Sequence, residues 1–161
     1  MNQRSPSDAL RLPNARLPVL FIGHGNPMNA VQDNAFTRRL AELGRSLDRP
    51  KAILCISAHW LTEGSWVTHM TKPKTIHDFY GFPKALFDVQ YPAPGSPELA
   101  RLIQTEIGNQ RLDPEVDAWG LDHGTWSVLK HMYPLADTPV LQLLIHRVSS
   151  ELADKSRIIR Q

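Results

Sequence analysis

The sequence predicts an α/β fold, in which a mostly parallel or mixed sheet is flanked by helices within a single domain. Two short apolar runs, Pro18–Met28 and Ala52–Trp60, are rich in Val, Ile and Leu. Such runs are typical of strands buried on both faces of a parallel sheet. Between them, Asn34–Leu47 places its apolar side chains on one helical face, with Asp33 as the expected N-cap. The three segments therefore predict a right-handed βαβ unit.

Size and composition fit one globular domain and exclude several classes of protein. A chain of 161 residues can bury a substantial core. Its net charge of +2 is too small to indicate nucleic-acid binding, and no apolar run approaches the ~20 residues that span a bilayer. The single cysteine, Cys55, lies inside an apolar run, which favours a buried thiol and no disulfide. We expect a cytoplasmic protein with no nucleic-acid or membrane partner.

The later elements are predicted from cap and turn signals. Ser96-Pro97 is a typical helix start and Gly108 a typical stop. The segment 71–97 holds five prolines among aromatic side chains, which predicts a long ordered loop over the sheet edge rather than disorder. The other predicted elements are strands over Ser65–Met70, Leu112–Trp119 and Thr138–Ile145 and a helix over Thr125–Tyr133.

Both apolar runs stop at a histidine, His24 in the first and His59 in the second. The carboxyl ends of parallel strands meet at one edge of a sheet, where open α/β folds bind ligands. We therefore expect the two imidazoles to converge and bind a metal, and a structural role is the alternative for either histidine alone. His123 beside Asp122 leaves three roles open: hydrogen bonding around a metal ligand, contact with substrate, or a part in the turn.

The loop 71–97 supplies further candidates. His77 and Tyr80 lie in a stretch rich in phenylalanine and tyrosine. Beside a metal, such side chains would wall an apolar pocket for a flat substrate, and the alternative is that they pack as core under the loop. We expect His77, Tyr80 and Asp122 to bind substrate.

Five motifs occur in a fixed order along the chain: GHGNPM (Gly23–Met28), SAHW (Ser57–Trp60), HDFYGFP (His77–Pro83), YPAPGSPELA (Tyr91–Ala100) and DHGTWSVL (Asp122–Leu129). Together they resemble the class III extradiol ring-cleavage dioxygenases, in the 4,5-DOPA dioxygenase branch. The resemblance runs from about Leu17 to Ile145.

The resemblance implies an oxidoreductase that opens a catechol such as DOPA with O2 at a non-haem metal. His24 and His59 would then be metal ligands, and His123 would be the catalytic base near the substrate. Fe(II) is the metal expected for activity, since Zn(II) in the same site has no redox chemistry. The product would be of the muconic semialdehyde type.

The ending departs from the family pattern. Family members continue beyond the strand Thr138–Ile145 with a portion that supplies another metal ligand and an acid–base histidine. We therefore expect a leader over 1–16, a partial α/β domain over 17–145 and a divergent tail over 146–161, in a C-terminally truncated chain. Weak iron binding and little or no turnover of DOPA are expected, and His146 is the local candidate for a lost ligand.

Two other functions fit the same residues. One is a non-catalytic metal- or small-molecule-binding remnant of the same fold. The other is a zinc hydrolase at the same strand ends, for which Glu63 is the nearest carboxylate to His59 that could act as a base. Glu63 also fits a solvated turn, which disfavours the hydrolase.

Overall fold

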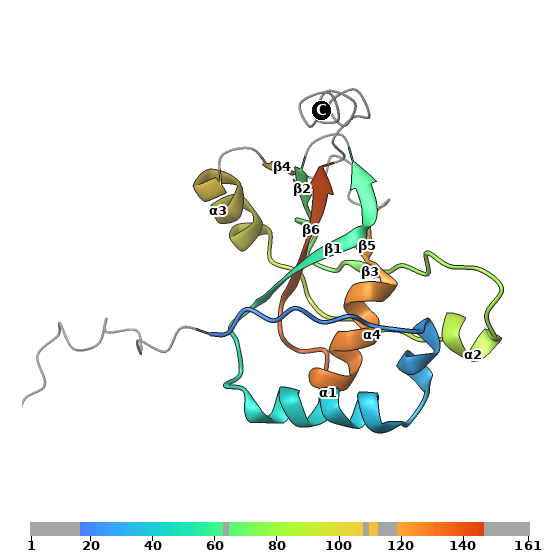
Figure 1. Cartoon of the computed structure of the whole chain (residues 1–161). Helices are drawn as coiled ribbons and strands as arrows, with labels where there is room; N and C mark the ends of the chain where they lie inside the picture. Colours follow the sequence, from blue (N-terminus) through green and yellow to red (C-terminus); the bar gives the residue numbers. More distant parts are fainter. Residues whose placement is uncertain (1–16, 63–64, 108–109, 113–118, 147–161) are drawn as a thin grey trace, which may run out of the picture.

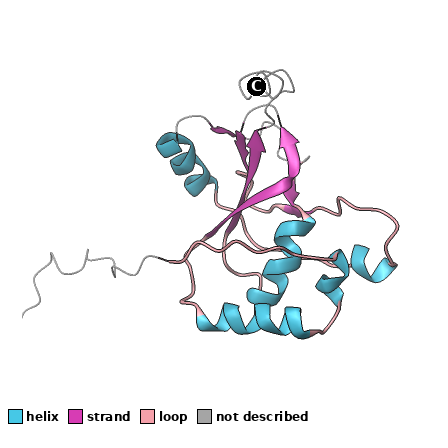
Figure 2. Cartoon of the chain, viewed as in Figure 1, coloured by secondary structure: helices cyan, strands magenta, loops and turns pink. Residues whose placement is uncertain are grey.

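The computed structural model describes residues 17–62, 65–107, 110–112 and 119–146, drawn in colour in Figure 1. Strands gather at one end and most helices at the other, as the colouring in Figure 2 shows. The helices are η2 (Pro27–Val31, a 3-10 helix), α1 (Ala35–Ser46), α2 (Lys84–Phe87), α3 (Pro97–Ile107) and α4 (His123–Met132). The strands are β1 (Ile53–Thr62), β2 (Ser65–Val67), β3 (Lys74–Thr75), β4 (Gln110–Leu112), β5 (Gly120–Leu121) and β6 (Val140–His146).

The main sheet is mixed, as predicted. Its strand order is β1-β6-β2-β4, in which β6 runs parallel to β1 and antiparallel to β2, and β2 runs parallel to β4. A second, two-stranded sheet pairs β3 with β5 in parallel. The predicted strands Ala52–Trp60 and Thr138–Ile145 are confirmed as β1 and β6, which lie side by side although they are far apart in the sequence.

The first predicted strand is wrong. Within Pro18–Met28 the structure has irregular backbone followed by the start of η2, so the predicted βαβ unit is not formed. Val19 is 99% exposed and Phe21 is 103% exposed; on β1, Ile56 is also exposed, at 65%. A strand needs both a hydrogen-bonded neighbour and a buried face, and in the described part of the chain this apolar run has neither.

The helix α1 is confirmed, but Asn34 and not Asp33 is its N-cap. The Asn34 side chain accepts from the backbone N–H of Thr37, while the Thr37 hydroxyl accepts from the backbone N–H of Asn34. This reciprocal pair satisfies two amides that the first turn leaves free. Leu40 of α1 packs against α4, and the contact is close because a Cβ on Gly44 would lie only 2.2 Å from the carbonyl oxygen of Met132.

The side chains of β6 alternate between two layers of helix. Leu141 packs with α3, whereas Val140 packs with α4 in the main core. Because successive side chains point to opposite faces of a strand, α3 and α4 cover opposite faces of the sheet, as their positions in Figure 1 show. The helix α4 starts two residues before the predicted Thr125, because the carboxylate of Asp122 caps it by accepting from the backbone N–H of Thr125.

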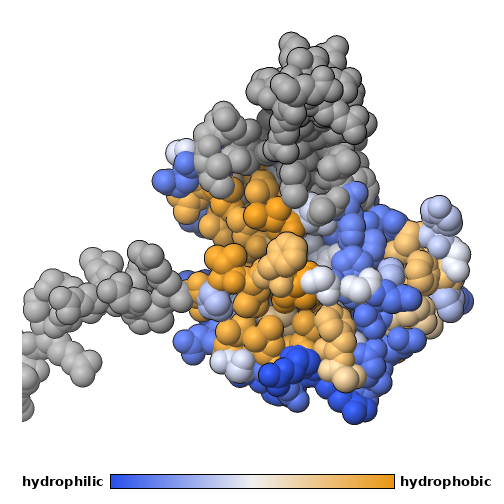
Figure 3. Space-filling model, in the orientation of Figure 1, coloured by the Kyte–Doolittle hydropathy of each residue, from blue (hydrophilic) through white to orange (hydrophobic). Residues whose placement is uncertain are grey.

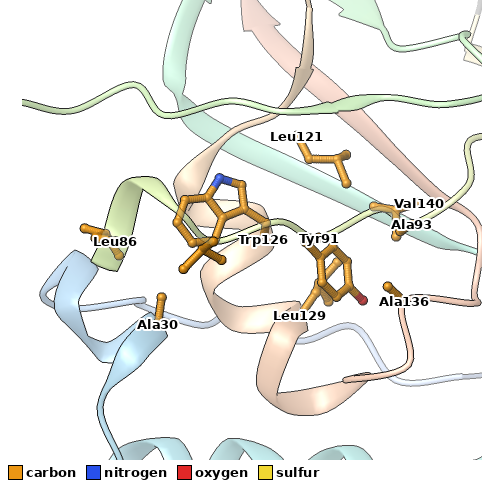
Figure 4. Close-up of a cluster of buried hydrophobic side chains, with 10 residues drawn as sticks. Ala30, Leu86, Tyr91, Ala93, Leu121, Trp126, Leu129, Ala136 and Val140 are labelled. Carbon is orange, nitrogen blue, oxygen red and sulfur yellow. The ribbon is translucent and has the colours of Figure 1, made fainter. Parts of the chain in front are cut away.

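The main core ties the segment 71–97 to α4 (Figure 4). Trp126 is completely buried there, and its indole N–H donates to the carbonyl oxygen of Ile76 at 2.8 Å. Tyr91 is also buried, and its hydroxyl donates to the carbonyl oxygen of Tyr133. These bonds satisfy the polar atoms that large aromatic side chains carry into a core. The mostly irregular segment 71–97 is therefore hydrogen-bonded to residues at both ends of α4.

Parts of the prediction lie outside the described residues: the leader 1–16, the tail from residue 147 onward, and residues 113–118 of the predicted strand Leu112–Trp119. None of the helices that the structure describes has the length and apolar character needed to cross a membrane.

Candidate metal centre

Three imidazoles from separate parts of the chain form one cluster. The ring centroids of His24 and His59 are 4.9 Å apart, those of His24 and His123 are 4.9 Å apart, and those of His59 and His123 are 4.1 Å apart. A ligand nitrogen from each lies within 4.8 Å of the others. The structure thus brings together the two predicted metal ligands and the predicted catalytic histidine.

The geometry of His24 and His59 fits a shared metal ion. Their Nε2 atoms are 3.1 Å apart and their rings are nearly perpendicular, at 81°. Two nitrogens that each bind one ion at about 2.1 Å, with a bond angle near 90–100°, lie roughly 3.0–3.2 Å apart. In the metal-free protein a proton can bridge the same two nitrogens, and a cation would replace that proton.

The position of His24 depends on the turn that follows it. Gly25 adopts φ +66°, a left-handed conformation that glycine tolerates, and the Asn29 side-chain amide donates to the carbonyl oxygen of His24 at 3.1 Å. Burial lowers the pKa of His24, and positive charge on His123 and His59 lowers it further against the opposing effect of Asp122 and Asp78. The neutral ring, which is the form that binds a metal, is therefore favoured.

The second ring, His59, lies at an irregularity in the β1–β6 ladder. Ser57 pairs with Leu144 and Leu61 pairs with Ile145, so Ala58, His59 and Trp60 have no partner in β6. The backbone N–H of His59 donates instead to the Ser57 hydroxyl at 3.3 Å. Extra residues of this kind bend a strand and redirect its side chains, and they are frequent beside functional sites.

His123 is stacked on His59 and is poorly placed to bind the same ion. The planes of the two rings differ by only 8° at a centroid distance of 4.1 Å. Stacked rings are separated by roughly 3.5 Å, the contact distance of carbon atoms. An imidazole binds a metal through a lone pair in its own plane, so an ion in the plane of the His59 ring lies outside the plane of the His123 ring. The arrangement supports His24 and His59 as ligands and His123 as their neighbour.

A buried polar network lies behind His59. Asp122 is completely buried; its Oδ1 accepts from the backbone N–H of Thr125, and its Oδ2 accepts from the side-chain amide of Gln142 at 2.8 Å. Gln142 Oε1 accepts from the backbone N–H of Asp122, and the Thr68 hydroxyl accepts from the backbone N–H of Gln142. The Asp122 carboxylate lies 3.7 Å from Nδ1 of His59. The network joins the start of α4 to β6 and places negative charge next to that nitrogen.

The structure does not bring all of the expected substrate residues to the cluster. The His77 ring lies among Phe79, Phe87 and Trp126, and its Nε2 is 3.0 Å from the carbonyl oxygen of Val89. Tyr80 is 93% exposed on the irregular segment before α2. Asp122 adjoins the cluster, but both carboxylate oxygens accept hydrogen bonds from the protein.

Three residues at the cluster were missed as individual site candidates. Asp78 binds Nδ1 of His123 at 2.8 Å, the Phe79 ring meets the His123 ring edge-on at 5.4 Å, and Gly124 lies against His59. A carboxylate and an aromatic ring in HDFYGFP, and a glycine directly after a histidine at a helix start, were the available signals. Glu63 lies outside the described residues, as does the side chain of His146.

A known family model matches most of the chain. Residues 19–160 match the family model described as the catalytic LigB subunit of aromatic ring-opening dioxygenase. All of the clustered histidines lie within this range.

Individual relatives agree with the family match. The chain is 53% identical over 130 residues to a 4,5-DOPA dioxygenase extradiol of Escherichia coli K12, covering 81% of this chain and 48% of that protein. It is 44% identical over 133 residues to a protein of the same name from Beta vulgaris, covering 79% and 49%. The crystal structure of an uncharacterized protein from Escherichia coli K12 superimposes with a TM-score of 0.56 at 45% identity, covering 73% of this chain and 43% of that one. The chain thus spans about half the length of the curated relatives it matches.

Proposed function

Because this chain belongs to the family of the catalytic LigB subunit of aromatic ring-opening dioxygenase, we propose that His24 and His59 bind the divalent metal of an extradiol dioxygenase. The reaction proposed for this site is the opening of a catechol by O2. Its substrate class is suggested by relatives named 4,5-DOPA dioxygenase extradiol. The observation that carries the proposal is the 3.1 Å separation between the Nε2 atoms of His24 and His59.

The proposed metal is Fe(II), with Zn(II) as an inactive occupant of the same site. Bound Fe(II) supplies open coordination positions and the redox chemistry that activates O2, whereas zinc offers no redox chemistry. Paired imidazole nitrogens suit either metal. We also propose that the protein works in a reducing cytoplasm, which is supported by its single cysteine.

The side chains beside the metal ligands are assigned roles in handling the substrate. Nε2 of His123 accepts a proton from a catechol hydroxyl, since Nδ1 of that ring is already bound to Asp78. Phe79, edge-on to His123, offers an apolar wall for a flat ring. Tyr80, exposed at 93%, has the freedom to move toward a bound ligand, whereas His77 and Asp122 support the site through their contacts.

Metal titration of the purified 161-residue chain tests the proposal first. We expect one Fe(II), added without oxygen, or one Co(II) per chain, and loss of that binding in His24→Ala and in His59→Ala. The control is His131→Gln, because the glutamine amide can replace the bond from the His131 ring to the carbonyl oxygen of Asn29. Binding that survives in both alanine variants would contradict the assignment of the ligands.

Turnover is tested separately with L-DOPA and Fe(II), followed by O2 uptake and by the yellow ring-opened product. The chain is expected to turn over slowly, because the parallel stacking of His59 and His123 leaves two and not three imidazole nitrogens directed at one point. The same stacking favours the second candidate function, a metal- or small-molecule-binding protein without catalysis. Metal binding that requires His24 and His59, with no O2 uptake above that of free Fe(II), would establish this second function.

A further inference from the structure

One carboxylate, that of Asp78, lies between two rings of the histidine cluster. Its Oδ1 accepts from Nδ1 of His123 at 2.8 Å and from the backbone N–H of the same residue at 3.0 Å. Its Oδ2 lies 3.8 Å from Nδ1 of His59. Only 16% of the side chain is exposed. The irregular segment that precedes α2 therefore sends a largely buried acid to the start of α4.

The contact between Nδ1 of His123 and Oδ1 of Asp78 determines which tautomer of the ring the protein favours. A carboxylate accepts hydrogen bonds and does not donate them, so Nδ1 of His123 must carry the proton. The neutral ring then has its lone pair on Nε2. The same carboxylate and that of Asp122 lie 3.8 and 3.7 Å from Nδ1 of His59.

The alternative role for Asp78 is that of a metal ligand together with His59 and Asp122, whose donor atoms are also close together. The hydrogen bonds argue against it. Both oxygens of Asp122 accept from protein donors, and Oδ1 of Asp78 accepts twice from His123. A cation bound between these residues would compete with the hydrogen bonds that Asp122 and Oδ1 of Asp78 already accept.

We propose that Asp78 is a positioning residue that holds His123 with its Nδ1 protonated and its Nε2 free to accept a proton. The use of that lone pair on a catechol rests on the proposed function, whereas the tautomer itself does not. Burial acts to raise the pKa of Asp78, but the hydrogen bonds and charge of His123 outweigh it and lower that pKa, so the carboxylate is ionised at neutral pH.

Long-range 1H–15N correlation spectra of the histidine side chains test the tautomer directly in the metal-free, full-length chain. The signals of His123 are assigned by their absence in His123→Asn. We expect a protonated Nδ1 and an unprotonated Nε2 in the parent protein. A parent ring protonated at Nε2 and not at Nδ1 would overturn the proposal, even before any Asp78 variant is made.

Variants of Asp78 then show whether its carboxylate determines the tautomer of His123. Asp78→Ala is expected to shift His123 toward the Nε2-protonated form, and Asp78→Asn to keep most of the original form, because its amide oxygen accepts the same bonds. Asp88→Ala is the matched control, since that carboxylate is 57% exposed and pairs with Lys84. An unchanged His123 tautomer in Asp78→Ala would contradict the proposal.

The effect of Asp78 on catalysis is measured separately. In Fe(II)-loaded protein that opens a catechol, Asp78→Ala should lower kcat roughly 10- to 100-fold, the usual cost of losing such a partner, with KM changed much less. Metal stoichiometry should stay that of the parent. A parent chain without turnover would count against the proposed function but leave the tautomer result standing, whereas a normal kcat in Asp78→Ala would refute the positioning role.

Discussion

Gly124 leaves the space that the imidazole of His59 occupies. A Cβ added to Gly124 would lie 2.5 Å from Cε1 and 2.8 Å from Nδ1 of His59, which is closer than any van der Waals contact allows. The first turn of α4 can therefore approach β1 at this point only because residue 124 has no side chain. The glycine directly after His123 thus affects a different histidine of the cluster.

We predict that Gly124→Ala lowers the affinity for Co(II) or Zn(II) at least tenfold by displacing His59, comparable to the usual effect of disturbing a ligand's support. Alanine is the better helix former by about 0.5–1 kcal/mol, so the metal-free fold should persist. Isothermal titration measures the affinity. Gly23→Ala is the matched control, because its Cβ would meet nothing within 4 Å. Equal metal affinity in the two variants would disprove this reading of the contact.

The buried bond between Asp122 and Gln142 should be important for stability. Asp122→Ala removes the cap of α4 and leaves the Gln142 amide without its acceptor, so we predict a loss of about 2–4 kcal/mol in the free energy of unfolding. Urea denaturation of the metal-free protein measures it. Asp122→Asn, which keeps an acceptor for the Thr125 amide, should lose less.

The exposed Asp88→Ala serves as control for that experiment and should change stability by less than about 0.5 kcal/mol. If Asp122→Ala unfolded at the same urea concentration as Asp88→Ala, the network would be structurally dispensable.

The thiol of Cys55 should be inert in the native protein. Burial raises its pKa from 9.0 to about 12, with a smaller opposing effect from a hydrogen bond to Thr125, so the reactive thiolate is rare at pH 8. We predict that Ellman's reagent labels the native chain slowly and the urea-unfolded chain rapidly. Rapid labelling of the native chain at pH 8 would show that the thiol is accessible and ionised.

The raised pKa of Cys55 also makes the stability of the protein decrease with rising pH. Above pH 9 the Cys55 thiol loses its proton in the unfolded chain but keeps it in the folded protein. The contribution of this thiol to the free energy of unfolding is therefore complete below pH 9 and is lost as the pH rises toward 12. Cys55→Ala should therefore lose stability less steeply than the parent between pH 9 and 11.

The exposed Phe21 should contribute little to stability. Phe21 is 103% exposed, so Phe21→Ser should change the free energy of unfolding by less than about 0.5 kcal/mol. The face in Figure 3 carries a broad hydrophobic area, and exposed apolar surface binds hydrophobic dyes. Dye fluorescence should decrease in the variant. By contrast, Leu40→Ala in the α1–α4 contact should cost about 2–5 kcal/mol. A similar cost for Phe21→Ser would mean that Phe21 is buried in solution.

The success of the sequence prediction depended on how local each signal was. The helix α1 and the strand β6 were predicted because their patterns lie within a single segment. The run Pro18–Met28 has the same apolar character, but a strand also needs a neighbour to pair with, and composition contains no information about that neighbour. Its hydrophobicity indicated that this segment favours burial, but it could not show that the described chain offers no strand to pair with it.

In the candidate site, too, residues with a local sequence signal were predicted and residues that act through distant contacts were missed. His24, His59 and His123 stood out because each adjoins glycine, alanine or aspartate at the end of an apolar run or in a turn. Asp78 was not selected, because its importance arises from a contact with His123, which is 45 positions away in the sequence. Gly124 was missed for the same reason: its role is to leave space, and the residue that uses the space belongs to β1.

We expect the break in the β1–β6 ladder to let the site open independently of the sheet. Ladder pairs on both sides of Ala58–Trp60 can remain closed while this short stretch opens, because it shares no pairing with β6. Its amides should then exchange with solvent deuterium through local openings that require much less free energy than global unfolding. A ligand bound by His59 would slow this exchange without changing that of the neighbouring ladder, so the site can reorganise while the sheet remains intact.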